Sequence, residues 1–438
     1  MQQLQRFSPA SAQRSVVERV FSRLLNRMRN QITFLIFFAV IIPMIGYQLV
    51  FSLPSFITVQ AATIGGSALA LVCGYIAYRK LLIFPGISAG GYVIMSTTAS
   101  FGFLTTLFVF LRIDYSRWQL FSSYLLSTAG LILIHLFVER RRHRVFGYVR
   151  GGRTEHRPAV NGIQWLDIPN PDSYVANVDL VVVDLHHDHA PDWEHAIARW
   201  VLAGIPVYDM RVASEQITGR VEIKHISENT LGSLNPNALL IKIKSAGDLM
   251  MASVLLLGLA IPMALIAIVI RLDSPGPAIF RQRRTGFRAQ PFTVYKFRTM
   301  YVAPETSDVD EAREQAMTQS EDLRVTRFGR FLRRSRLDEL PQLFNIVKGD
   351  MSLIGPRPEA ISLSEWYSRE IPYYHYRHII KPGLTGWAQI NQGHVTSVSE
   401  IREKLNLDFY YVKNYSLWLD ILIILRTIVI MFSGHGAR

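Results

Sequence analysis

The stretch MMASVLLLGLAIPMALIAIVI, residues 250 to 270, decides how this chain is built, because it can either cross a membrane or turn back within it. It contains no charged residue and has the length of about 20 residues that a membrane-spanning helix needs. Both of its flanks are basic, so the positive-inside rule places both of its ends in the cytoplasm. The basic residues are Lys242, Lys244, Arg271, Arg281, Arg283, Arg284 and Arg288.

Pro262 lies near the middle of this stretch. A proline inside a helix removes one backbone hydrogen bond and bends the axis. A helix over residues 246–271 that enters the membrane, bends at Pro262 and returns satisfies both the bend and the basic flanks. The alternative is an ordinary spanning helix with a kink, which would place everything after it on the opposite side of the membrane.

Four further apolar runs precede this stretch, at roughly residues 31–51, 56–78, 88–111 and 118–138. Each is close to the length of a membrane-spanning helix. The first 30 residues and the ERRRHR motif after the fourth run are basic, so both ends of the set are expected in the cytoplasm. No Asp, Glu, Lys or Arg lies inside the runs, although transporters and proton relays usually need such residues there. We therefore expect a basic cytoplasmic segment, 1–30, and a four-helix transmembrane bundle, 31–138, that acts as an anchor.

The composition agrees with a membrane protein that meets anions. Of the 438 residues 49% are apolar and 18% are charged, and the net charge is +13. A strongly basic chain suggests membrane lipid, nucleic acid or phosphorylated substrates as partners. Cys73 is the single cysteine, which excludes a disulfide within the chain and a cysteine-based zinc site.

Residues 139–238 have the pattern of an α/β module. VDLVVVDL at 178–185 is typical of a buried parallel strand, and DWEHAIARWVLAG after it predicts an amphipathic helix that ends at Gly204. IPVYDM at 205–210 and RVFGYV at 144–149 predict two more strands. Together these elements predict a Rossmann-like cytoplasmic domain.

Two features of this module invite a ligand, and the sequence favours neither. The turn RGGRTEH after the strand at 144–149 lacks the G-x-G-x-x-G spacing that seats a pyrophosphate. HHDHAPDWEH at 186–195 contains possible metal ligands, but without a clear ligand spacing a polar loop is the favoured interpretation.

The C-terminal third gathers positive charge. FTVYKFRTM at 292–300 alternates like a strand and offers Lys296 and Arg298 to phosphate groups. Four arginines then recur every three residues, and on a helix they would line one side. Such a face suits phosphate oxygens, which guanidinium groups bind in pairs, or lipid headgroups. The four are Arg324, Arg327, Arg330 and Arg333.

Two neighbouring acids, Asp338 and Glu339, follow the arginines. On a helix their side chains would point about 100° apart, so they cannot easily share one proton-transfer task. They can divide the work: one attacks phosphorus, and the other holds a divalent cation that neutralises phosphate charge.

LDELPQLFNIVKGDMSLIGPRPE, YKFRTM and KPGLTGWAQINQG closely resemble the bacterial sugar transferases. These are polyprenyl-phosphate hexose-1-phosphate transferases, the large monotopic phosphoglycosyl transferases. The resemblance covers residues 244–438, and the bundle and the Rossmann-like module also match the large subclass in order and size. It implies a mixed membrane fold with a catalytic phosphoglycosyl transferase domain over 239–438.

The resemblance implies an enzyme that moves a hexose 1-phosphate from a UDP-sugar such as UDP-glucose to undecaprenyl phosphate and releases UMP. This is the first membrane step of exopolysaccharide, capsule or O-antigen synthesis. Glucose or galactose is the expected sugar, although no motif decides. By resemblance Asp338 is the nucleophile of a covalent phosphosugar intermediate and Glu339 binds Mg²⁺. The residues expected to bind substrate are Lys296, Arg298, Arg333, Arg336, Arg357 and Asp408.

The resemblance also implies a homodimer in the bacterial inner membrane, with the catalytic domain on the cytoplasmic face, membrane lipid as a partner and no nucleic acid. The family often breaks its re-entrant helix at Ser-Pro, whereas Ile261 precedes Pro262 here, so the bend rests on the proline alone. The alternative function is a non-catalytic scaffold that binds anionic lipid through its arginine face. That scaffold predicts a dispensable Asp338 and leaves GDMSLIGPRPE unexplained.

Two C-terminal segments have open roles. GLTGWAQINQG at 383–393 fits a substrate-binding loop and a plain structural turn about equally. YSLWLDILIILRTIVIMF at 415–432 mixes charges with apolar stretches and predicts a helix that lies in the membrane interface rather than crossing it. The middle domain could regulate the enzyme, form a dimer or contact later enzymes.

Overall fold

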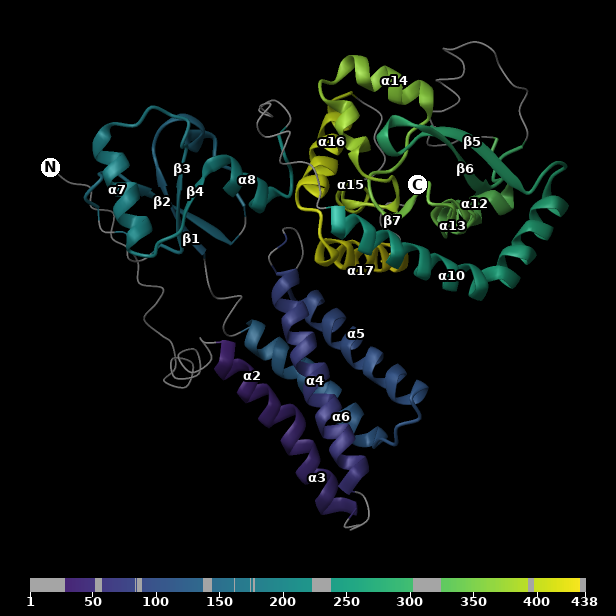
Figure 1. Cartoon of the computed structure of the whole chain (residues 1–438), viewed down its shortest axis with the longest axis horizontal. Coiled ribbons are helices and arrows are strands. Elements are labelled where there is room, and N and C mark those ends of the chain that lie inside the picture. Colours follow the sequence, from purple (N-terminus) through teal and green to yellow (C-terminus); the bar gives the residue numbers. More distant parts are fainter. Residues whose placement is uncertain are drawn as a thin grey trace. The chain divides into compact units, whose positions relative to one another are not determined.

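A computed structural model describes most of the chain, which divides by its internal contacts into two units, Met1–Ile217 and Thr218–Arg438 (Figure 1). The first unit contains a helical bundle and a parallel sheet, and the second contains the acid pair. The described residues are 28–51, 57–82, 84, 89–136, 144–160, 162–173, 175, 178–222, 238–301, 324–392 and 398–433.

The bundle consists of long apolar helices joined by tight packing. A π-helical turn, Phe37–Ile41, joins the first two into one rod. Segments Met28–Leu49, Val59–Leu81 and Gly90–Phe110 are each long and apolar enough to cross a membrane. The predicted fourth span appears as α6, and residues 137–143 lie outside the described part. The helices are α2 (Met28–Ile36), α3 (Ile42–Phe51), α4 (Ile57–Leu81), α5 (Ala89–Phe110) and α6 (Arg117–Ile134).

Neutral polar contacts hold the interior of the bundle. The buried Tyr75 hydroxyl donates to Gln31 Oε1 at 2.5 Å, and the Ser116 N–H donates to Thr63 Oγ1 at 3.0 Å. Among its described residues the bundle buries no Asp, Glu, Lys or Arg. The described interior of the bundle is therefore held by hydrogen bonds of neutral groups, and its role as an anchor stays a prediction.

The α/β module forms a four-stranded sheet in the order β2-β1-β3-β4, with all strands parallel. The strands and the helix predicted from the sequence are confirmed, while β2 and α8 had no predicted counterpart. The elements are β1 (Arg144–Val149), β2 (Ile163–Ile168), β3 (Leu180–Val183), α7 (Pro191–Leu202), β4 (Val207–Asp209) and α8 (Met210–Thr218).

Helices cover both faces of this sheet because side chains alternate along β3. Val181 and Val183 pack on Trp200 of α7, whereas Val182 packs on Met210 of α8. All three valines are fully buried. A short continuous valine run therefore reports a central strand covered on both sides, as the sequence predicted.

The second unit begins earlier than the boundary expected at residue 239. The N–H of Val221 donates to the carbonyl of Asn406, and the indole of Trp387 donates to the carbonyl of Gly219. Residues 218–222 therefore belong with the second unit, although no apolar run marks them in the sequence.

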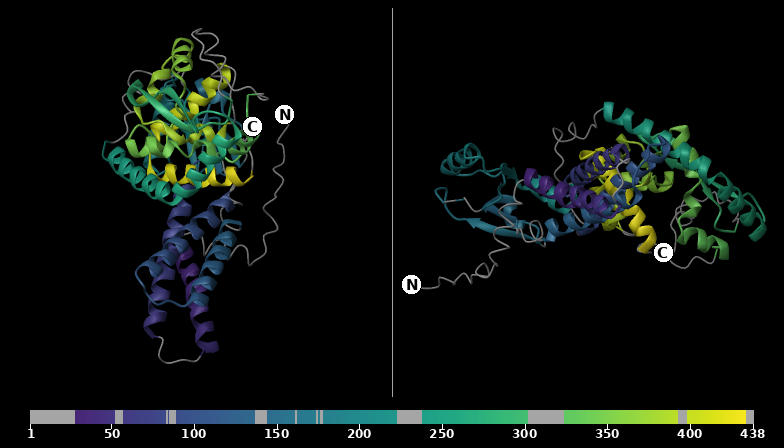
Figure 2. Two further views of the ribbon diagram at one scale, coloured as in Figure 1. Left: turned by 90° about the vertical axis from the view of Figure 1, so that its right-hand side faces the viewer. Right: turned by 90° about the horizontal axis from the view of Figure 1, so that it is seen from below.

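Helix α10, Ala238–Asp273, contains Pro262 and is longer than the predicted 246–271. By length and composition it too could cross a membrane. Its axis changes direction along its length, and together with α17 (Leu417–Ser433) it lies on one side of the unit (Figures 1 and 2). At its start Lys244 pairs with Asp420 of α17 at 2.9 Å, and at its end the Arg298 guanidinium binds its last carbonyls. Both ends of α10 are therefore attached to the same unit.

An antiparallel hairpin and short helices form the rest of the unit. The predicted strand within FTVYKFRTM is confirmed as β6, which pairs with β5. Further elements are β5 (Ile279–Thr285), β6 (Pro291–Phe297), α12 (Arg327–Arg334), α13 (Gln342–Lys348), β7 (Ser352–Ile354), α14 (Ile361–Glu370), β8 (Gly383–Thr385), α15 (Trp387–Asn391), α16 (Val398–Lys413) and α17 (Leu417–Ser433).

The acids do not share a helix with the arginines, and they do not lie on an α-helix, the geometry for which the sequence analysis considered their spacing. Thr326 caps α12 at its start, and Arg336 adopts a left-handed conformation with φ of 59° that ends it. The acid pair then lies on a separate 3₁₀ turn, Leu337–Glu339, ahead of α13. Asp338 and Glu339 are thereby aimed by a turn rather than by helical spacing.

Helix α17 has one buried face and one exposed apolar face. Leu419, Leu422 and Ile423 are fully buried, whereas Ile421, Ile424 and Ile428 are exposed. Its two charged residues point inward: Asp420 pairs with Lys244, and Arg426 donates to Asn391. An exposed row of isoleucines beside α10 agrees with a helix that lies on a membrane surface.

Candidate active site

Three basic side chains from three elements converge on one carboxylate oxygen of Glu339. Arg357 Nη2 lies 2.7 Å from Oε1, Lys296 Nζ lies 3.4 Å away and Arg336 Nη1 lies 3.8 Å away. Lys296 comes from β6, Arg336 from the turn between α12 and the acid pair, and Arg357 from the loop after β7. Glu339 itself is buried, and a buried charge persists only when it is paired in this way.

Asn345 fixes the acid pair relative to Lys296. It is fully buried on α13, where its Oδ1 accepts from the N–H of Tyr295 at 3.1 Å and its Nδ2 donates to the carbonyl of Thr293 at 2.6 Å. These bonds tie α13, which follows the acids, to β6, which carries Lys296. Sequence reasoning missed Asn345, although an amide inside the apolar run LPQLFNIV was a usable signal.

Asp338 differs from its neighbour in having no partner for one oxygen. The residue is half-buried, and its Oδ1 atom is buried without a hydrogen-bond partner among the described residues. Burial raises the pKa of Asp338, and the negative charge of Glu339 raises it further. A more basic carboxylate is a better nucleophile once it is deprotonated.

Glu339 and Lys296 respond to the same surroundings in other ways. Burial alone would raise the pKa of Glu339, but Arg357 and Lys296 outweigh it and hold that pKa well below its usual range. Burial, with the neighbouring Arg357 charge, lowers the pKa of Lys296 to about 8. Glu339 is therefore held in its ionised form, whereas Asp338 takes up a proton more readily than an ordinary aspartate.

The oxygens of the pair fit a magnesium ion. Mg²⁺ in phosphate-handling sites is bound by one or two carboxylates together with substrate oxygens. All three cations make their closest contact with Oε1 of Glu339. The second carboxylate oxygen of Glu339 is the hard donor that this turn would offer to the ion.

The other predicted substrate-binding residues lie elsewhere. The Arg298 guanidinium binds the carbonyls of Ile270, Ser274 and Pro275 and so closes the C-terminal end of α10. Arg333 donates through Nε to Thr299 Oγ1 at 2.9 Å. Asp408 is buried and pairs with Arg377 at 2.8 Å. The structure thus brings Lys296, Arg336 and Arg357 to the acid pair and gives Arg298, Arg333 and Asp408 protein partners.

The described part of KPGLTGWAQINQG packs against the loop that carries Arg357. Strand β8 pairs with β7, and a Cβ built on Gly383 would lie 2.0 Å from the backbone N of Gly355, whose loop carries Arg357. Trp387 is buried and stacks on Tyr410. Between the two roles left open by the sequence, these contacts favour the structural one.

In the first unit Asp184, His186 and Asp209 place three possible ligand atoms within 4.8 Å of one another. Each of the four carboxylate oxygens already accepts a backbone N–H: Asp184 from Arg153 and His186, and Asp209 from Leu185 and Arg211. These bonds explain the cluster as caps at the strand ends, in agreement with the favoured interpretation of a polar loop.

Comparisons with known proteins place this chain in a family. Residues 240–434 match the model of the bacterial sugar transferase family. The UDP-N-acetylgalactosamine-undecaprenyl-phosphate N-acetylgalactosaminephosphotransferase of Aeromonas hydrophila is 41% identical over 388 residues, which are 87% of this chain and 89% of that protein. The chain therefore belongs to the bacterial sugar transferase family and, like this relative, is a transferase enzyme.

Two relatives with another sugar match a shorter part. The UDP-glucose:undecaprenyl-phosphate glucose-1-phosphate transferase of Xanthomonas campestris pv. campestris is 40% identical over 50% of this chain and 43% of its own length. That of Escherichia coli K12 is 41% identical over 44% of this chain and 41% of its own length. The matched part is less than half of either glucose-1-phosphate transferase.

Proposed function

We propose that this enzyme transfers a sugar 1-phosphate from a UDP-sugar to undecaprenyl phosphate, with Asp338 as the nucleophile. The observation that carries the proposal is the contrast within the acid pair. Glu339 is held in its ionised form by Arg357 and Lys296, whereas Asp338 has a buried oxygen without a hydrogen-bond partner in the described part of the chain and has a raised pKa. A scaffold that only binds lipid would have no use for such a contrast.

The reaction then runs in two displacements. Oδ1 of Asp338 attacks the sugar-linked phosphorus of the donor, the phosphorus–oxygen bond to UMP breaks, and UMP leaves with the electron pair. A phosphate oxygen of undecaprenyl phosphate next attacks the same phosphorus, and Asp338 leaves as a carboxylate. The covalent intermediate divides one difficult transfer into two easier ones.

The basic residues stabilise the charge that develops on the phosphates. Arg357, Lys296 and Arg336 surround Glu339 and are positioned before the substrate arrives, so little reorganisation is needed during the reaction. A bound Mg²⁺, held by Glu339 and by phosphate oxygens, would neutralise further negative charge on the diphosphate.

We also propose that α10 enters the membrane and returns, so that the site faces the cytoplasm at the inner membrane. Support comes from the ion pair of Lys244 at its start and from the Arg298 contacts at its end, because both attach to the unit that holds Asp338. A helix that crossed would have to separate these contacts. The homodimer implied by the resemblance stays a prediction.

The sugar is best sought with a panel of donors. UDP-glucose and UDP-galactose are the donors that the family resemblance implies, and UDP-N-acetylgalactosamine is the donor in the name of the relative that matches 87% of this chain. We propose UDP-N-acetylgalactosamine as the first donor to test, because that match also spans the bundle and the middle module.

Release of UMP from this panel tests the proposal. Purified full-length protein with Mg²⁺ and undecaprenyl phosphate should release UMP with at least one donor, and Asp338→Asn should reduce the rate by about a thousandfold or more. Chelation of the metal should abolish release. Release that survives in Asp338→Asn would remove Asp338 as the nucleophile, and silence with every donor would favour the scaffold.

A further inference from the structure

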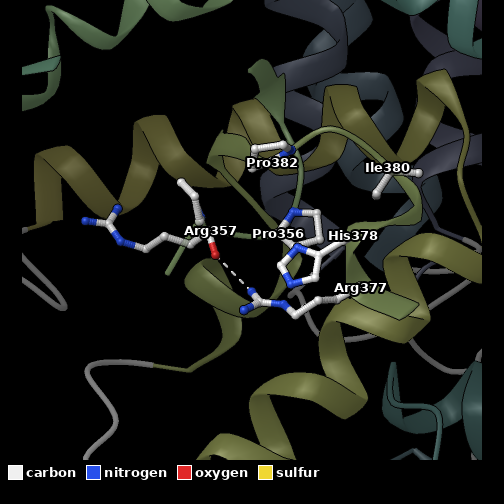
Figure 3. A pocket seen from close by; sticks show the side chains of 7 residues that line it. Pro356, Arg357, Arg377, His378, Ile380 and Pro382 are labelled. Carbon is white, nitrogen blue, oxygen red and sulfur yellow. Dashed lines mark hydrogen bonds between the residues drawn. The ribbon is translucent and has the colours of Figure 1, made fainter. Parts of the chain in front are cut away.

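We infer that Arg377 is a positioning residue, which holds Arg357 against Glu339 by binding the backbone carbonyl of Arg357. The inference rests on the proposed function and adds a residue to it. The Nη2 of Arg377 donates to this carbonyl at 2.9 Å, and the Arg357 side chain leaves on the opposite side (Figure 3). Arg377 is only 3% exposed. Among the described residues its hydrogen bonds and ion pairs are with Tyr374, Glu359, Asp408 and the Arg357 carbonyl rather than with the acid pair, so it would act through Arg357.

The two prolines of the segment GPRPE explain why the rest of the protein holds this segment through its backbone carbonyls. Pro356 and Pro358 have no backbone N–H, so this segment offers few donors to the rest of the protein. Its carbonyls are bound one after another instead. That of Pro356 accepts from the Gly383 N–H, that of Pro358 from the Arg284 guanidinium and that of Glu359 from the Thr285 N–H.

Arg377 supplies the remaining bond, to the carbonyl of Arg357 itself. The acceptor of this bond belongs to Arg357, the residue whose side chain contacts Glu339. Of the bonds to this segment, it therefore lies closest along the chain to that side chain. A shift of about 1 Å in a positioning contact is enough to lower a rate about a hundredfold. The position of the Arg357 guanidinium therefore depends on the buried Arg377, which does not contact Glu339 itself.

Acids and a phenol fix Arg377 in turn. Its Nη1 donates to the Tyr374 hydroxyl at 2.7 Å, and its Nη2 lies 2.8 Å from Oδ2 of Asp408. Glu359 lies 4.0 Å away and is itself paired with Lys404. This arrangement gives Asp408, which was predicted to bind substrate, a different part: it holds the charge of Arg377 within the protein.

A guanidinium is needed because the contacts point in different directions. Arginine presents several N–H groups in a rigid plane and can serve a hydroxyl, a carbonyl and a carboxylate at once, whereas the single ammonium of lysine cannot reproduce that geometry. Arg377→Lys keeps the positive charge and removes the planar set of N–H donors. Asp408→Asn keeps the shape and removes the pairing charge.

A double-mutant cycle on UMP release tests the inference in the full-length enzyme. Arg357→Ala should lower kcat about a hundredfold, and Arg377→Lys should lower it about tenfold with a smaller change in KM. Because Arg377 acts through Arg357, the double variant should be no slower than Arg357→Ala alone. Effects that multiply to about a thousandfold would overturn the inference.

Two controls separate positioning from general loss of stability. Leu363→Ala removes a buried side chain of α14 in the same unit and should lower Tm. Arg377→Lys should lower kcat by the same factor whether it is made in the wild-type enzyme or in the Leu363→Ala variant. Arg369→Lys makes the same substitution at an exposed arginine and should leave kcat and Tm unchanged. Equal losses of kcat in Leu363→Ala and Arg377→Lys at matched Tm would also count against positioning.

A structure of Arg377→Lys answers the question without relying on activity. The inference predicts that the contact between Arg357 and Glu339 is lost or lengthened while the fold is kept. An unchanged contact at about 2.7 Å would overturn it. If the wild-type enzyme releases no UMP, the proposed function fails, and this structure still decides the role of Arg377.

Discussion

At the scale of single residues, neighbouring groups with the same chemistry take opposite properties from their surroundings. Asp338 and Glu339 are adjacent, yet burial dominates at Asp338, whereas cations outweigh burial at Glu339. The difference comes from Arg357 and Lys296, which lie on other elements. The sequence could place the two acids but could not assign their protonation, because the cations reach them only through the fold.

His378 gives a prediction about pH at this scale. Burial, with the neighbouring charges of Arg377 and His375, lowers the pKa of His378 to about 3, and its Nε2 has no hydrogen-bond partner among the described residues. The unfolded chain takes up a proton near pH 6.5, whereas the folded protein does not until about pH 3. Stability should therefore fall as the pH is lowered through this window, by at most about 1.4 kcal/mol per pH unit.

Thermal unfolding between pH 7 and pH 4 measures this effect. His378→Asn, which cannot be protonated, should flatten the dependence of Tm on pH relative to the parent protein. His195→Asn, at an exposed histidine of α7, should leave the dependence unchanged. A parent and a His378→Asn variant with the same slope would show that His378 is not held neutral.

At the scale of elements, the short strands β7 and β8 are held together by glycine. A Cβ on Gly383 would lie 2.0 Å from the N of Gly355 and 2.6 Å from the carbonyl oxygen of Thr385. Both neighbours are backbone, which cannot move aside as a flexible side chain can. The close approach sets the position of the loop that carries Arg357.

Gly383→Ala should therefore destabilise the second unit by about 2–3 kcal/mol or more and lower UMP release along with Tm. Gly247→Ala is the matched control, because a Cβ on Gly247 of α10 meets no atom within 4 Å. That variant should keep or slightly raise Tm, since alanine favours a helix over glycine. The account of this contact is wrong if both variants melt alike.

Elements with a periodic pattern were predictable, and pairings between distant segments were not. The valine run of β3, the helix α7 and the alternating strand β6 follow from local patterns and are confirmed. The turn that carries the acids was not predicted. The chain leaves the helical direction at Arg336, which has a left-handed conformation, and an arginine in the sequence does not signal such a conformation. Arg298 was expected to bind phosphate, yet it caps α10, because a basic residue in a motif does not reveal which partner is nearest.

At the scale of the whole molecule, the course of α10 decides which side of the membrane holds the site. In a Cys73→Ser background, cysteines at the exposed positions Lys242 and Asp273 report the two ends of this helix. Both should resist a membrane-impermeant maleimide in intact spheroplasts and react after lysis, because both ends are expected in the cytoplasm.

Asp114→Cys, in the exposed connection between α5 and α6, is the control that should react from outside. Protection of one end of α10 and labelling of the other would show an ordinary spanning helix. Labelling of both ends from outside would place Asp338 on the wrong face for a cytoplasmic donor.

The most direct measurement of the central claim is the mass of the intact protein after incubation with a UDP-sugar and Mg²⁺ in the absence of undecaprenyl phosphate. The account predicts a population heavier by one sugar phosphate, with the added mass on the peptide that contains Asp338. The adduct should disappear when undecaprenyl phosphate is added and should not form in Asp338→Asn. A wild-type enzyme that releases UMP without ever carrying this adduct, or that carries it on another residue, would contradict the account.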